Sequence, residues 1–256
     1  MSQWQAFRGI FHRDLLVFWR NFRSNSIRVF VQPLFFMLLF GVVMPRMGLF
    51  QRAYSGILVP GMLSMSIMTA SAFGVGSIIG IGLFRNKEIR AHILAPLSIE
   101  LYVIEKILYG MVQALVSVVA MLAVAFALFP GTLAIPNPLA FLAIVALTST
   151  VFSSFGIIVA SRTDRPPTMF EVLQLVIMPL MFFGATFFPL SAMREFGAAY
   201  WVLHLLPNVY ASEGMRALLT PEVEHLPLGY ALLFLVPWAA VLYAVALREF
   251  RRRIIA

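Results

Sequence analysis

Long apolar stretches separated by short polar segments dominate the sequence. A helix needs roughly 20 mostly apolar residues to cross the hydrocarbon layer of a membrane, which is about 30 Å thick. We predict membrane-spanning helices over 27–44, 56–84, 101–129, 139–161, 169–188 and 226–247. The predicted fold class is an all-α membrane protein with six transmembrane helices, and residues 1–256 form one transmembrane domain.

Basic residues lie mainly on alternate connecting segments. Fifteen of the 19 lysines and arginines fall in the N-terminal arm, in 85–106, in 162–165 or in the C-terminal tail. The other face holds Arg46, Arg52, Arg194 and Arg216. Because basic residues are retained on the cytoplasmic side, this asymmetry places both termini in the cytoplasm of a multi-pass protein of the plasma (inner) membrane.

Composition narrows the function classes. The chain is 61% hydrophobic and 12% charged, which excludes an ordinary soluble domain. The chain has a net charge of +8, and its basic residues border the predicted spans. We therefore expect it to contact anionic lipid headgroups and not to bind nucleic acid. Cysteine is absent, which excludes disulfides and thiolate metal sites.

The first 26 residues predict an amphipathic helix lying in the membrane interface. Its four arginines fall mainly off the apolar stripe, whose members recur at helical spacing: Phe7, Ile10, Phe11, Leu15, Phe18 and Phe22. This helix is either an anchor alone or a lever that also touches a cytoplasmic partner. The span over 56–84 is rich in glycine and serine, which predicts close packing of helices.

Two connecting segments are unusual. The cytoplasmic segment 85–106 contains a short apolar helix over 89–94, interrupted by Pro96, whose apolar face must lie on lipid or in a groove of a partner. The outer segment 184–225 is too long for a plain loop and is divided by Pro189, Pro207 and Pro221. We predict re-entrant or interfacial helices there, on the outer leaflet.

The sequence contains none of three common catalytic or nucleotide-binding motifs. It has no GxxxxGK[ST] loop, no HExxH pair and no GxSxG elbow, and its four histidines are scattered. We expect Glu105, Lys106 and Glu171 to be interfacial charges. Since the spans hold almost no buried acid, an ion-coupled carrier is disfavoured, and energy for transport would enter from outside the membrane domain. Methionine and phenylalanine in the fifth span either pack the helices or accommodate bulky amphipathic molecules.

Two sequence blocks carry a family resemblance. Residues 90–97 read RAHILAPL, and residues 184–189 read GATFFP, followed by PNVYASEGMR at 207–216. Together with the predicted spans, they resemble the membrane subunits of ABC-2 type exporters, which include drug, nodulation-factor and polysaccharide permeases. Arg90 and Ala91 stand where the family usually has an acidic pair.

The resemblance implies a permease subunit of an ATP-driven exporter, which is a transport subunit and not an enzyme. A separate nucleotide-binding subunit would bind ATP and Mg, this chain would bind no cofactor or metal, and a second copy would complete the membrane pathway. A cytoplasmic coupling helix around 89–97 would meet the ATPase through Arg85, Lys87, Glu88, Arg90, Ile93, Leu94 and Pro96. Helices around 190–218 would form the exit gate.

Candidate pathway or gate residues are Met178, Phe182, Phe183, Phe187, Phe188, Tyr210, Glu213 and Arg216. The substrate would be an amphipathic, lipid-like, drug-like or glycan molecule. The alternatives are a membrane-embedded enzyme acting on lipid or prenyl substrates, which would need converging carboxylates or histidines, and a structural membrane protein without transport.

Overall fold

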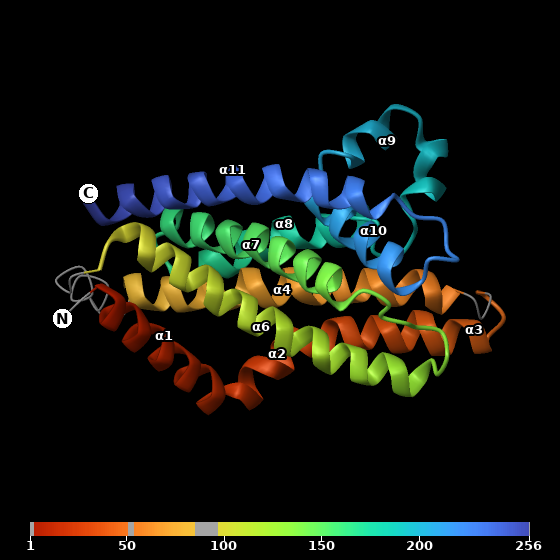
Figure 1. The fold of residues 1–256 in the computed structure, drawn as a ribbon, viewed down its shortest axis with the longest axis horizontal. Helices are drawn as coiled ribbons and strands as arrows, with labels where there is room; N and C mark the ends of the chain where they lie inside the picture. Colours follow the sequence, from red (N-terminus) through yellow and green to blue (C-terminus); the bar gives the residue numbers. More distant parts are fainter. Residues whose placement is uncertain (1–2, 51–53, 85–96, 256) are drawn as a thin grey trace.

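The protein is built from long helices that run side by side (Figure 1). The structure, a computed structural model, describes residues 3–50, 54–84 and 97–255, and every regular element in these ranges is helical. The prediction of an all-α protein is therefore confirmed. Five helices are long and apolar enough to cross a membrane, and the stretch predicted as the first span falls on a shorter apolar helix, Phe30–Arg46.

The N-terminal region holds two helices that meet at Asn21. Helix α1 covers Gln3–Arg20 and α2 covers Phe22–Leu38. The helix predicted over residues 1–26 is therefore shorter, because the backbone leaves helical geometry at Asn21, with φ −101° and ψ 13°. A π-helical turn, η1 (Leu39–Val43), and the short α3 (Met44–Arg46) continue α2. Figure 1 shows α1 running obliquely to the bundle.

Helix α4 (Tyr54–Phe84) lies at the centre of the bundle. It contacts α2, α6 (Ile99–Leu128), α7 (Pro138–Arg162), α8 (Pro166–Phe183) and α10 (Pro207–Leu219). Its buried side chains point in all directions, as expected for a helix that is apolar all round.

Glycine makes the packing around α4 possible. A Cβ atom at Gly61 would lie 1.9 Å from the carbonyl oxygen of Thr186, and one at Gly156 would lie 2.5 Å from that of Ala72. Small residues allow such backbone approach where packing, and not exclusion of water, joins helices. The close packing predicted from the small residues of 56–84 is confirmed.

The C-terminal half consists of two long helices and an interrupted segment between them. Helix α8 covers Pro166–Phe183 and α11 covers Leu228–Ile255. Between them lie the 3₁₀ helix η2 (Leu190–Phe196), α9 (Ala198–Leu203) and α10 (Pro207–Leu219). Gly197, at φ +59°, separates η2 from α9.

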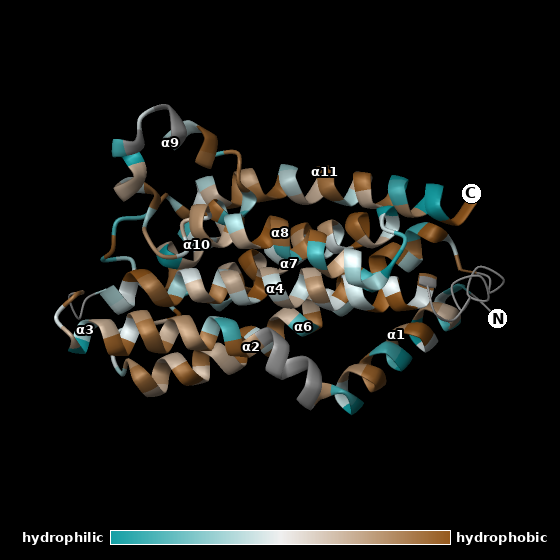
Figure 2. Ribbon diagram, turned by 180° about the vertical axis from the view of Figure 1, so that it is seen from behind, coloured by the Kyte–Doolittle hydropathy of each residue, from teal (hydrophilic) through white to brown (hydrophobic). Residues whose placement is uncertain are grey.

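The predicted division of this outer segment into short helices is therefore confirmed. The fifth predicted span is shorter than expected, because α8 ends at Phe183 and leaves Phe187 and Phe188 in the following turn. Hydrophobic residues run along the long helices, whereas hydrophilic ones mark α1 and the last turns of α11 (Figure 2).

Replacing Gly61 with alanine tests the close packing of α4. We expect Gly61→Ala to reduce the free energy of unfolding by about 1–3 kcal/mol, because the methyl group would meet the Thr186 carbonyl. Gly229→Ala is the matched control, since a Cβ there has no neighbour within 4 Å. Thermal unfolding in detergent measures both, and equal melting temperatures for the two variants would contradict the packing described.

Candidate functional site

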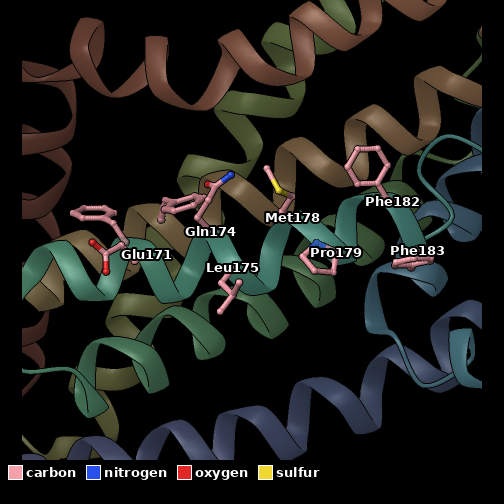
Figure 3. Close-up of a pocket in the computed structure, with 9 residues that line it drawn as sticks. Glu171, Gln174, Leu175, Met178, Pro179, Phe182 and Phe183 are labelled. Carbon is pink, nitrogen blue, oxygen red and sulfur yellow. The ribbon is translucent and has the colours of Figure 1, made fainter.

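An open apolar groove runs along α8. Its volume is about 830 Å³, within the range of small-molecule sites. Phe73 comes from α4 and stacks on Phe170 of α8 with ring centroids 6.4 Å apart. The groove is lined by Phe73, Phe170, Glu171, Gln174, Leu175, Met178, Pro179, Phe182 and Phe183. Figure 3 shows Gln174, Met178 and Phe182 projecting along one side of α8, with Glu171 nearer the start of the helix.

Three of the predicted pathway residues meet in this groove. Met178, Phe182 and Phe183 all line it, and each exposes about half of its surface (49%, 49% and 56%). Phe187 is buried beside the groove and stacks on Phe182 at 5.4 Å, whereas Phe188 is exposed in the turn after α8. Met178, Phe182 and Phe183, singled out in the fifth predicted span, therefore lie together along α8.

The sequence prediction missed several residues of the groove. Residues 171, 174, 178 and 182 recur at three and four positions, so they share one face of a helix. The opposite face carries the buried Met169, Leu173, Ile177 and Met181. This spacing could have separated the two faces of α8 and would have placed Glu171 and Gln174 beside the predicted Met178.

The other three predicted residues, Tyr210, Glu213 and Arg216, lie away from the groove, inside the protein. Arg216 is fully buried on α10, and its Nη1 donates to Glu213 Oε1 at 2.7 Å. Its Nε donates to the carbonyl of Ile57 on α4, and its Nη2 donates to the carbonyls of Ala185 and Thr186. The guanidinium thereby ties α10 to α4 and to the turn after α8.

The Glu213 carboxylate holds two further backbone segments. It accepts hydrogen bonds from the N–H groups of Leu190 at 2.8 Å and Leu226 at 2.9 Å. Burial lowers the pKa of Arg216 and the Glu213 carboxylate raises it, and arginine stays charged near neutral pH in either case. This ion pair therefore organises both ends of the outer segment 184–225.

Neutral polar groups complete the cluster around Glu213 and Arg216. Ser64 of α4 donates to Asn208 Oδ1 at 2.8 Å, and the Asn208 amide donates to Thr186 Oγ1 and to the carbonyl of Gly184. Tyr210 donates to the carbonyl of His204 at 2.7 Å and stacks on Phe234 of α11. Satisfied networks of this kind hold helices together and leave no side chain free to act on a substrate.

A second buried charged cluster lies where α1 meets α6. Lys106 Nζ contacts the Asp14 carboxylate and lies 2.8 Å from Glu105 Oε2. All three side chains are almost completely buried within the protein, so Glu105 and Lys106 are paired with each other and do not lie on the surface of the chain. Neither oxygen of Glu105 has a hydrogen-bond partner among the described residues, so charge alone holds it.

The predicted coupling residues Arg85, Lys87, Glu88, Arg90, Ile93, Leu94 and Pro96 lie outside the described residues. Their position in the chain is nevertheless bounded, because α4 ends at Phe84 and α6 begins at Ile99, capped by the Ser98 hydroxyl. These helix ends lie at the same end of the molecule as the start of α1 and the end of α11 (Figure 1).

Ion pairs join the helix ends there. Arg251 of α11 pairs with Glu100 of α6, and Arg253 pairs with Asp164 in the turn before α8 at 3.0 Å. Arg162 of α7 and Glu249 of α11 form a third pair at 3.0 Å. Exposed pairs contribute little singly, but together they link the ends of α6, α7 and α11.

The open groove on α8 offers an apolar surface for binding. Over 3–50, 54–84 and 97–255, no three histidine, cysteine or acidic side chains come together as metal ligands. The polar clusters are internally paired, whereas the groove on α8 is open and adaptable.

Removing Lys106, the cation shared by Asp14 and Glu105, tests what holds α1. We expect Lys106→Met to reduce the free energy of unfolding by about 3–5 kcal/mol, because two buried carboxylates lose the cation that they share. Arg13→Gln is the control, since Arg13 also pairs with Asp14 but is 43% exposed, and we expect less than about 1 kcal/mol. Unfolding in detergent measures both, and similar losses would show that the buried cluster is not what fixes α1.

Comparison with known proteins agrees with this arrangement. Residues 5–220 match the family model described as ABC-2 type transporter, whereas no curated protein matches the chain. The match covers α1 to α10 and includes both charged clusters and the groove. The resemblance seen in the sequence is confirmed: the chain belongs to the ABC-2 type transporter family, as a membrane permease and transport subunit without an ATPase domain.

Proposed function

We propose that the chain is the permease subunit of an ATP-driven exporter and that two copies form the membrane pathway, with the groove on α8 as its lining. The protein would lie in the plasma (inner) membrane with both termini in the cytoplasm and six spans, α2 with η1 and α3 forming the first. The transported molecule would be amphipathic, whether lipid-like, drug-like or a glycan.

The uncovered face of α8 is the observation that carries this proposal. Helix α8 buries only the strip Met169, Leu173, Ile177 and Met181 within the chain. Its other face exposes aromatic and methionine side chains along a groove of about 830 Å³. Surfaces of this kind accommodate varied apolar molecules, and a second copy facing the groove would enclose it.

Energy would come from a separate ATPase subunit that binds ATP and Mg. The segment 85–96 lies between the end of α4 and the start of α6, so a force on it would reach both helices. Asp14 and Lys106 would pass the same movement to α1, because a buried ion pair is costly to separate. Membrane lipid would contact the exposed aromatic face of α1.

The outer segment would act as the exit gate. The Glu213–Arg216 pair would make η2, α10 and the turn after α8 move together, so that Tyr210, Glu213 and Arg216 position the gate without touching the substrate. The alternative of an enzyme acting on lipid or prenyl substrates gains no support from the groove, because its lining residues in the described part of the chain include a single carboxylate and no histidine.

Cross-linking of introduced cysteines tests the paired arrangement. Because the chain has no cysteine, Leu175→Cys adds a single thiol on the exposed face of α8. We expect oxidation in native membranes to yield a disulfide-linked dimer, seen on a non-reducing gel. Val119→Cys, 65% exposed on α6, is the control and should stay monomeric. Dimers from both variants, or from neither, would contradict a pathway lined by α8.

Charge and polarity changes in 85–96 test coupling to the ATPase. We expect Leu94→Asp or Arg90→Glu to weaken co-purification of the ATPase subunit about tenfold, because a polar or inverted side chain would enter the contact. Membrane insertion should stay normal. Arg46→Glu is the control at the opposite end of the molecule (Figure 1). Unchanged co-purification with Leu94→Asp and Arg90→Glu would contradict the proposal that this segment contacts the ATPase subunit.

A further inference from the structure

Glu171 is the exception among the acidic side chains of the long helices. Its carboxylate is exposed in the groove, and no hydrogen bond or ion pair ties it to another group in the described part of the chain. By contrast, Glu105 and Glu249 are paired with Lys106 and Arg162. Acidic side chains in membrane helices usually serve a function, and an exposed one is available to a ligand.

The surroundings of Glu171 favour a cation. Among the described residues that line the groove it is the one with a charge, and the stacked rings of Phe73 and Phe170 line the groove with it. Aromatic faces attract organic cations, most strongly where water is partly excluded. Gln174 lies one helical turn further along and adds an amide that can hydrogen-bond a polar head.

The rest of the groove suits an apolar body. From Glu171 to Phe183 the helix rises about 18 Å, at about 1.5 Å per residue. Beyond Gln174 the lining consists of Leu175, Met178, Pro179 and two phenylalanines. A glycan would find few hydrogen-bonding partners there, and an anionic lipid headgroup would meet the Glu171 carboxylate.

We infer that the groove on α8 binds organic cations with an apolar or aromatic body, and that Glu171 selects for their positive charge. This inference rests on the proposed function in one respect, which is that the groove is taken as the substrate site. It assigns the charge of the substrate, which the family leaves open.

Three compact probes of similar shape test the charge preference directly. They are tetraphenylphosphonium, a cation, tetraphenylborate, an anion, and neutral triphenylphosphine oxide. Binding to the purified chain in phosphatidylcholine nanodiscs is measured by equilibrium dialysis, with empty nanodiscs subtracted to remove partition into lipid. We expect the cation to bind about tenfold more tightly than the neutral probe, and the anion to bind least.

Two groove variants change the expected affinity in opposite directions. Glu171→Gln should weaken binding of the cation about tenfold and leave the neutral probe unchanged. Gln174→Glu should strengthen binding of the cation about threefold, because it adds a second carboxylate to the same face. Glu222→Gln removes an exposed carboxylate from the outer segment, away from the groove, and should change neither.

Equal affinities for the cation and the neutral probe would overturn the inference, as would an unchanged cation affinity in Glu171→Gln. An equal loss with Glu222→Gln would also overturn it, since the effect would then come from overall charge. Cation-selective binding that never stimulates the ATPase of the assembled complex would support the inference and count against the proposed function. Equal stimulation of the ATPase by all three probes would support the proposed function and count against the inference.

Discussion

Charge that is buried inside the protein must find its partner there, and this constraint holds the non-spanning parts of the structure in place. Water does not reach such groups, so separating them costs several kcal/mol. At one end, Lys106 joins Asp14 of α1 to Glu105 of α6. At the other, Arg216 and Glu213 join α10 to α4 and to the turn after α8. Each cluster fixes an element that apolar packing alone would leave free to slide.

Helix α4 connects the two clusters and the groove. The N-terminal part of α4 receives Arg216 through the Ile57 carbonyl and Asn208 through Ser64, while Phe73, further along, forms a wall of the groove. Close contacts at Gly61 and near Gly156 leave this helix little room to tilt independently. A displacement at the end of α4 would therefore be transmitted along its axis, since packed interiors move as rigid units and do not deform smoothly.

The lengths of the apolar stretches predicted the long helices well but could not predict the pairing of their charges. The apolar stretch predicted over 56–84 corresponds closely to α4, because length and composition alone define a buried helix. Asp14 lies between Ile10 and Phe18 on the buried face of α1, a position that marks it as paired, yet its partner Lys106 lies far away in sequence. The end of α8 was also missed, because Phe187 and Phe188 continue the apolar run after the helix has ended at Phe183.

Acidic side chains of this chain occur both buried in charged clusters and exposed in the groove on α8. Asp14, Glu105 and Glu213 are buried against a cation and serve to hold helices together. Glu171 has the same chemistry but lies exposed on α8, among aromatic and methionine side chains that conform to many shapes. An adaptable apolar surface discriminates poorly by shape, so a fixed charge is the feature by which it can still select. Selection by charge with tolerance of shape is what an exporter of varied amphipathic molecules requires.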